Sequence, residues 1–251
     1  PGGWDGLADA LRAGRPVGLE LHDPPRPEGI PFARWRRLSR LSRFAASAVL
    51  PLLEEVGDPR SVPLVLGSAM GEVVPSSAFL DRLFAEGPEN ASPLAFQGSV
   101  YNATAAGLSL AFDLRGPSQT VSAGMMTGLA ALRRGLSLLA SHGQALVVLA
   151  DDRNPTTSQA YGERPYAEAV VALLLERGDE IAVLDGPGVP VWGRAAALPY
   201  EGRFTAVGRP VEATLGLHPA SGLLAWLATG EPAAEHDDGV CLRVSRPRPA
   251  P

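Results

Sequence analysis

Lysine is absent from this chain of 251 residues, and all 22 of its basic residues are arginine. A chain without lysine cannot form a pyridoxal Schiff base, hold a phosphate through a P-loop lysine or use lysine as a general base. Cysteine is nearly absent, because Cys241 is the only one. An intrachain disulfide framework and a cysteine-rich zinc site are therefore excluded.

Long apolar runs are missing as well, since none approaches the roughly eighteen residues of a membrane span. The net charge of −5 argues against a general nucleic-acid partner. The N-terminal segment PGGWDGLADALRAGRP has no basic region followed by an apolar stretch, so we expect no signal peptide and a cytoplasmic location. With 45% hydrophobic residues, the chain can bury the core of one large domain or of two fused halves.

Hydrophobic periodicity predicts helices and strands in alternation. Apolar residues at spacings of three and four predict one amphipathic helix over residues 34–57, ended by Gly57. Residues 61–69 (SVPLVLGSA) predict a buried strand that runs into a turn. Residues 76–87 predict a helix with a serine cap and a glycine stop, and residues 88–99 predict a loop.

The following segments continue the alternation. Residues 100–114 (VYNATAAGLSLAFDL) predict a helix rich in small residues and buried at a packing interface. Residues 116–143 predict a turn, a short strand, a sharp turn and a helix. Residues 144–152, 167–177 and 181–186 predict three more strands, and Asp151–Asp152 at the end of the first are expected to form a turn. Apolar strands between helices indicate an α/β fold whose sheet is covered on both faces.

The stretches RRLSRLSRFAASA, LVLGSAMGE and SPLAFQGSVYNATAAGLSLAFDLRGPSQTVSAG occur in an order and spacing that resemble the β-ketoacyl synthases of the thiolase fold. They are similar to an arginine-led helix, a strand ending in a G-S-x-x-G turn and the stretch that leads to the active-site elbow. The resemblance covers roughly residues 31–185. It implies a layered αβαβα fold with a largely complete N-terminal half (residues 1–185) and a shortened C-terminal half with a disordered tail (residues 186–251).

In this family the elbow carries a nucleophilic cysteine at a helix N-terminus, where unpaired N–H groups favour the thiolate. Counting from Gly116, Met125 stands at that position. A thioether has no ionisable proton, so the resemblance implies that thioester chemistry is lost. Thr127, two residues on, has no evident general base, and we expect it to cap or pack the helix.

The family also uses two histidines and a lysine in its second half. The first histidine motif has no counterpart here, and lysine is absent. GLHPASGLLAWL is similar to the second motif and would place His218 at the second histidine, although a packed or capping role for His218 is equally open. We therefore expect no catalytic residue, no metal and no bound cofactor, only a substrate chain carried on the phosphopantetheine of an acyl carrier protein.

Ketosynthase homologues that lack the catalytic residues resemble chain-length factors, which pair with an active ketosynthase in type II polyketide and aryl polyene synthesis. The resemblance implies a heterodimer formed through the strand before the elbow (SQTVSA), and an acyl tunnel shaped at the interface. The candidate tunnel or interface residues are Met70, Leu94, Ala95, Phe96 and Ser122. The alternative for each of them is an ordinary place in the interface core, and for any single residue that alternative is favoured.

Arg36 and Arg37 are the candidates for docking the carrier protein, whose helices are acidic. The alternative is a solvated helix face that only keeps the protein in solution. Two further functions remain open at this point. One is a decarboxylase of the thiolase fold that acts through His218 and backbone oxyanion donors; the other is a scaffold that binds no acyl chain.

Overall fold

The structure, a computed structural model, describes most of the first 176 residues and five short strands beyond them. The described ranges are 9–10, 12–16, 23–54, 56–124, 127–155, 168–176, 183–185, 203–206, 209–210, 234–236 and 243–245. The predicted boundary at residue 186 and the predicted disordered tail lie largely outside these ranges.

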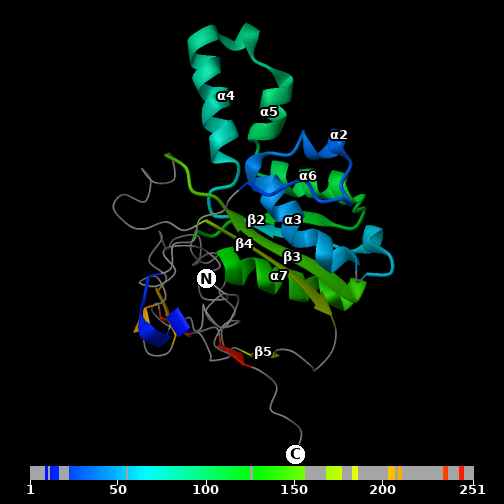
Figure 1. Cartoon of the computed structure of the whole chain (residues 1–251), viewed down its shortest axis with the longest axis vertical. Helices are drawn as coiled ribbons and strands as arrows, with labels where there is room; N and C mark the ends of the chain where they lie inside the picture. Colours follow the sequence, from blue (N-terminus) through cyan, green and yellow to red (C-terminus); the bar gives the residue numbers. More distant parts are fainter. Residues whose placement is uncertain are drawn as a thin grey trace, which may run out of the picture.

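A mixed four-stranded sheet in the order β2–β1–β3–β4 forms the centre of the molecule (Figure 1). β1 is parallel to both of its neighbours, and β4 is antiparallel to β3. The strands span Leu64–Gly67 (β1), Ser118–Val121 (β2), Gln144–Asp151 (β3) and Ala169–Glu176 (β4). All four strands are thereby confirmed as predicted: β1, β3 and β4 from their continuous apolar runs, and β2 as the short strand expected within residues 116–143.

Helices cover both faces of this sheet, as the apolar runs of β1 and β3 predict. α3 (Arg40–Glu54) and α6 (Ala103–Phe112) pack side by side on one face, and α7 (Thr127–His142) packs on the other (Figure 1). The core between α3, α6 and the sheet is built from fully buried side chains at alternate strand positions and at helical spacing. They include Leu41, Ala45, Val49, Leu64, Leu66, Leu108, Leu146 and Val148.

The prediction of a single helix over residues 34–57 is wrong at the N-terminal end. The chain forms a short helix, α2 (Phe32–Trp35), then a turn, and α3 starts only at Arg40. The reason is local, because the Ser39 hydroxyl accepts a hydrogen bond from the backbone N–H of Ser42 at 3.0 Å and caps the new helix. Leu38, in the turn, stays buried and so preserves the apolar period.

Two helices project from the three layers as a hairpin, α4 (Val73–Glu86) and α5 (Pro93–Ser99) (Figure 1). α4 begins three residues before the predicted serine cap, while its glycine stop is confirmed by Gly87 at φ +83°. The predicted loop over residues 88–99 is wrong. Ser92 caps α5 by accepting from the Ala95 N–H at 3.2 Å, and Pro93 occupies the first helical position, where no N–H is needed.

Five short strands follow β4. β5 (Val183–Asp185) and β9 (Arg243–Ser245) pair antiparallel. β5 confirms the strand predicted over residues 181–186, and β9 confirms the last strand, which GVCLRVSR (residues 239–246) predicts. β6 (Arg203–Ala206) pairs antiparallel with β7 (Arg209–Pro210) and β8 (Ala234–His236), in a segment where periodicity predicts nothing definite. None of the helices in the described part of the chain combines the length and the apolar character of a bilayer-crossing segment.

Candidate functional site

The elbow between β2 and α7 has the geometry that the sequence predicts. Gly124 lies at φ +55°, a conformation that favours glycine, and α7 begins three residues later. Thr127 is fully buried; its hydroxyl donates to the Gly124 carbonyl at 2.6 Å and accepts from the Ala123 N–H at 2.9 Å. Of the two roles expected for Thr127, packing in the first turn of α7 is confirmed; its hydroxyl does not cap the helix, because it accepts from an N–H that precedes α7. Met125 and His218 lie outside the described residues.

A buried carboxylate fixes the turn after β1. Asp151, at the end of β3, accepts hydrogen bonds from the Ser68 hydroxyl at 2.8 Å and from the N–H groups of Ala69 and Met70, both at 2.9 Å. Burial raises the pKa of Asp151 to about 7, against these three bonds, which favour its ionised form. Asp151 was expected to form the turn at the end of its own strand; instead it is the last residue of β3 and fixes the turn after β1, a long-range partner that spacing could not identify.

Tyr101 ties this turn to the end of β2. Its hydroxyl lies 2.7 Å from the Ser68 carbonyl and 2.8 Å from the Ser122 hydroxyl. The Tyr101 ring packs against Gly71 (φ +60°), where an added Cβ would lie 2.9 Å from the ring. Met70 and Ser122, two of the candidate tunnel residues, are therefore held at the same edge of the sheet, beside the elbow.

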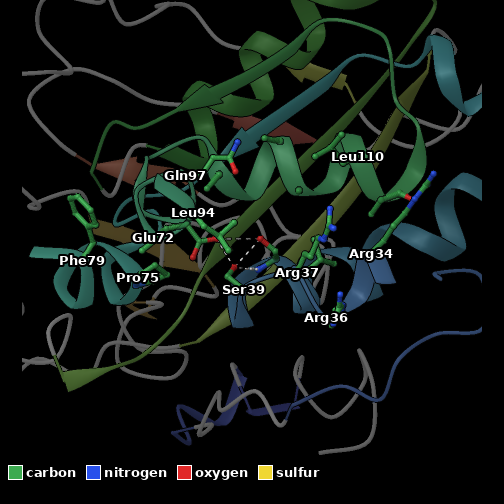
Figure 2. A pocket seen from close by; sticks show the side chains of 18 of the residues that line it. Arg34, Arg36, Arg37, Ser39, Glu72, Pro75, Phe79, Leu94, Gln97 and Leu110 are labelled. Carbon is green, nitrogen blue, oxygen red and sulfur yellow. Dashed lines mark hydrogen bonds between the residues drawn. The ribbon is translucent and has the colours of Figure 1, made fainter. Parts of the chain in front are cut away.

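A cavity of about 1360 Å³ lies between α2 and α3 on one side and α4, α5 and α6 on the other. Leu94, Ala95, Arg36 and Arg37 line it together (Figure 2). Phe96 does not line it but packs on Phe79, with ring centroids 5.6 Å apart. The structure thus divides the candidate tunnel residues into an elbow group and a hairpin group.

Glu72 lies on the wall of this cavity and is 4% exposed. Its Oε1 atom is surrounded by the hydroxyls of Ser39 (2.5 Å), Ser42 (3.2 Å) and Thr104. Burial raises the pKa of the Glu72 carboxyl, and the three hydroxyls partly offset that shift. Sequence reasoning missed Glu72, because a single glutamate at the start of a helix carries no periodic or motif signal.

The five arginines of residues 34–43 have different roles. Arg34 donates to the Ala111 carbonyl at 2.9 Å, and Arg43 lies 5.7 Å from the centre of the Trp35 ring. Arg40 forms ion pairs with its Nη1 to Glu168 (2.7 Å) and Asp152 (3.5 Å) and with its Nε to Asp23 (3.2 Å), and these neighbours raise its pKa.

Arg36 and Arg37 differ from those three. Both are exposed, and among the residues that the structure describes neither forms an ion pair or a side-chain hydrogen bond. The two residues chosen from the sequence for docking are therefore the pair in this segment whose guanidinium groups are available to a ligand.

Two surfaces have no cover within the described part of the chain. The first is the outer edge of β2, which pairs only with β1 in the described sheet. The second is the α4–α5 hairpin, where no residue is buried and where Phe84, Leu94 and Phe96 are 82%, 77% and 55% exposed. The predicted burial of α6 is only partly correct, because Leu110 is 74% exposed.

Comparison with protein families gives one match. The family model described as "Beta-ketoacyl synthase, N-terminal domain" matches residues 14–188, which is more than half of the chain. None of the curated proteins matches the chain significantly.

Solved structures similar to this chain include a ketosynthase (ApeO) in complex with its chain length factor (ApeC) from Xenorhabdus doucetiae. The similarity has a TM-score of 0.68 at 22% identity and covers 97% of this chain and 91% of that one. The ishigamide ketosynthase/chain length factor gives 0.64 at 18% identity, over 96% and 94%. A β-ketoacyl synthase from Burkholderia phymatum STM815 gives 0.56 at 20% identity, over 79% and 66%. The predicted α/β, thiolase-like fold is confirmed.

Proposed function

Because the chain belongs to the β-ketoacyl synthase family, we propose that it is a non-catalytic, chain-length-factor-like subunit that forms a heterodimer with an active β-ketoacyl synthase. Met125, at the position of the family's nucleophile, supports the absence of condensing chemistry. The similarity in fold to ketosynthase/chain length factor complexes supports the pairing.

The observation that carries the proposal is the unpaired edge of β2. The Pro117 and Val121 carbonyls accept from β1 and its following residue, so the backbone groups of Thr120 point to the opposite edge. The Thr120 hydroxyl is buried and has no hydrogen-bond partner among the described residues. A strand edge in this state is a template for a strand of a second subunit.

The α4–α5 hairpin extends the proposed interface. Its exposed apolar side chains, Leu94 and Phe96 among them, form the kind of patch that a partner covers. Ala95 leaves space at the position where a large side chain would close a tunnel. In a reconstituted aryl polyene or other type II polyketide system, we expect Ala95→Phe to shorten the product. An unchanged product length would remove the tunnel role from Ala95.

The same proposal includes a carrier protein. The chain itself holds no cofactor in this proposal, and the substrate arrives in the cytoplasm on the phosphopantetheine of an acyl carrier protein. Arg36 and Arg37, which form no ion pair with the residues that the structure describes, supply positive charge for its acidic surface. Reversing both charges is expected to weaken carrier-protein binding and to reduce its salt dependence.

The decisive experiment is co-expression with an active ketosynthase from the same genome, a neighbouring one where it is encoded, followed by co-purification. Thr120→Pro removes the outward N–H of β2 without touching the pairing with β1. We expect it to abolish the complex, while Thr120→Ala, which keeps the N–H, retains it. A wild-type chain that forms only homodimers would support the scaffold alternative. Malonyl-carrier decarboxylation by the purified chain, lost in His218→Ala, would support the decarboxylase.

A further inference from the structure

The α4–α5 hairpin is attached to the three layers at its base. No residue of α4 or α5 is buried, and the two helices project away from the sheet (Figure 1). At the base, the Ser76 hydroxyl of α4 donates to the Ser99 carbonyl at the end of α5, which joins the two helices to each other. Glu72, the residue before α4, is 4% exposed and joins them to the layers. A change at Glu72 therefore acts at the point where the hairpin leaves the layers.

The Glu72 carboxyl contacts both helices on this face of the sheet. Its Oε1 atom lies among the hydroxyls of Ser39, at the start of α3, Ser42, within α3, and Thr104, within α6 (Figure 2). The hydroxyls also contact one another, because Ser42 Oγ lies 2.9 Å from Ser39 Oγ and 3.2 Å from Thr104 Oγ1. We refer to Glu72 and these three hydroxyls as the base cluster. The base cluster fixes the beginning of α4 against α3 and α6.

The base cluster contains a carboxyl but no cation. Glu72 forms no ion pair with any residue that the structure describes, and α5 and α6 carry no charged residue. On α3, Arg40 is paired with acidic partners of its own, and Arg43 lies over an aromatic ring. On α4 the first charged residue is Asp81, more than two turns away. The charge of Asp152, after β3, disfavours ionisation of Glu72. Apart from the three hydroxyls, these surroundings suit the neutral acid better than the carboxylate.

The cavity beside Glu72 offers the opposite environment. Glu72 lines it together with Arg36, Arg37 and Arg82, and Arg36 and Arg37 form no ion pair within the described part of the chain. A carboxylate that turns toward the cavity gains water and positive charge. The neighbouring buried carboxyl, Asp151, is instead enclosed by its three donors and does not line the cavity. Glu72 therefore has two alternative environments, and Asp151 keeps the preceding turn in place.

The choice between these environments depends on pH. Burial raises the pKa of the Glu72 carboxyl above its ordinary value of 4.5, and the three hydroxyls only partly offset that rise. When the carboxyl reaches water, its pKa returns to the ordinary value. The stability that the protonated carboxyl gives to the attached hairpin is therefore complete below 4.5 and is lost as the pH rises through the raised pKa.

We propose that Glu72 is a pH-sensitive anchor of the α4–α5 hairpin. As the neutral acid it stays in the base cluster and holds the beginning of α4 on α3 and α6. When it loses its proton to water, the carboxylate leaves the hydroxyls, turns into the cavity toward Arg36 and Arg37, and frees the hairpin to move. The anchor is a property of this chain alone; its effect on a partner rests on the proposed function, in which the hairpin forms part of the interface.

Hydrogen–deuterium exchange of the full chain at about pH 5 and about pH 8 tests the anchor. Protection factors, which remove the intrinsic effect of pH on exchange, are compared for the amides of α4 and α5. Release of one proton on opening changes the opening equilibrium by up to about tenfold per pH unit, so we expect hairpin protection to fall about threefold or more. The β3 amides should stay far better protected at both values, because the opening is local. Unchanged hairpin protection would overturn the proposal.

Glu72→Gln keeps the shape of the side chain and cannot ionise. It resembles the neutral acid, because it has one accepting and one donating group, so hairpin protection should be the same at both pH values. Glu86→Gln makes the same chemical change at an exposed position of α4 and is the matched control, in which the pH effect should persist. A pH effect that persists in Glu72→Gln would belong to another group, such as Asp151, and would overturn the proposal.

Thr104→Val tests the hydroxyls without any change at Glu72. Valine nearly keeps the shape of threonine, but the loss of one donor leaves less to offset burial. The pKa of Glu72 should therefore rise further, and the pH at which hairpin protection falls should move upward. If Thr104 only packs, the variant changes protection equally at every pH without moving that transition, and this outcome would also overturn the proposal.

Heterodimer affinity separates this inference from the proposed function. Surface plasmon resonance compares the wild-type chain and Glu72→Gln on the ketosynthase partner. We expect equal affinities at about pH 5 and about threefold weaker binding of the wild-type chain at about pH 8. A complex in which the two chains bind equally at both pH values would overturn the effect on the interface. Failure of both chains to form a complex would overturn the proposed function, while the exchange measurements would still decide the anchor.

Discussion

The three-layer unit and the α4–α5 hairpin differ in how they bury their apolar side chains, although both lie in the segment that matches the family. In the layers, β3 is buried along seven of its eight residues, and α3 and α7 each bury one face. In the hairpin no residue is buried, and its largest apolar side chains face outward. The layers therefore carry their own stability, while the hairpin presents surface that becomes buried only against something else.

The sharpest test of this contrast is the same substitution in both regions. Leu146→Ala in β3 removes a side chain that is fully buried and leaves a cavity, so the free energy of unfolding should fall by about 2–5 kcal/mol. Leu94→Ala in α5 should change it by less than about 0.5 kcal/mol, because that side chain is already in water. Urea denaturation of the isolated chain measures the free energy of unfolding of both variants. Similar decreases in the two variants would contradict the difference between the layers and the hairpin.

Substitutions at two glycines give the second test of the contrast between the layers and the hairpin. An added Cβ at Gly67 in β1 would lie 2.7 Å from Leu149 and 2.9 Å from Ala131, so Gly67→Ala should cost about 1–3 kcal/mol through overpacking. At Gly98 in α5 nothing lies within 4 Å. Gly98→Ala should leave stability unchanged or raise it by up to about 1 kcal/mol, because alanine favours the helix. Thermal unfolding of both variants is the measurement, and a destabilising Gly98→Ala would count against the open hairpin.

The interface role of the hairpin predicts an effect on association rather than on folding. Phe96→Ala should weaken the heterodimer about tenfold, as truncation of an interface aromatic typically does. Phe32→Ala removes an equally exposed aromatic, 67% accessible, from α2 and is the control. Surface plasmon resonance with the ketosynthase partner measures both. If Phe32→Ala had the larger effect, the partner would lie on the wrong side of the molecule.

The smallest expected effect is a change of stability with pH, and it comes from Asp151 in the three-layer unit. Burial raises the pKa of Asp151 from 3.8 to about 7, so the folded state holds the proton more tightly than the unfolded state between these values. The stability contributed by the protonated carboxyl is complete below 3.8 and is lost as the pH rises through 7. Asp151→Asn lacks this titration and should be more destabilising at pH 6.3 than at pH 8, by about 1 kcal/mol. A difference independent of pH would contradict the assignment.

Local signals predicted much of the layer structure. The apolar runs of β1, β3 and β4 identified buried strands because a strand covered on both faces needs no polar positions. Gly87 and Gly124 identified a helix stop and the elbow, since both adopt positive φ. Thr127 was predicted to cap or pack the helix from its place at the helix start, and it packs there, fully buried.

The errors arose where a competing local interaction overrode the pattern. The helical period continues through Leu38, but the Ser39 cap restarts the helix at Arg40. Residues 93–99 contain small and polar residues that are typical of a loop, yet the Ser92 cap and contacts with α4 hold them as α5. Neither cap could be identified from apolar spacing, which records burial and not hydrogen bonds.

The candidate site shows the same division. Arg36 and Arg37 were chosen as docking candidates from the resemblance, but only the ion pairs of Arg40 and the hydrogen bond of Arg34 showed why those two differ from their neighbours. Glu72 and Tyr101 gave no sequence signal, because their partners are thirty or more residues away or on other elements.

The sequence by itself determined what chemistry is missing, because a residue type that is absent cannot be supplied by folding: there is no lysine, and Met125 stands at the nucleophile's position. It also determined the sheet, since burial on both faces requires unbroken apolar runs. Only the tertiary structure decided where the remaining chemistry gathers. The cavity and the buried carboxyls of Glu72 and Asp151 are produced by contacts between distant segments, as is the pairing of Arg40 that distinguishes it from Arg36 and Arg37. Those contacts leave no periodic trace along the chain.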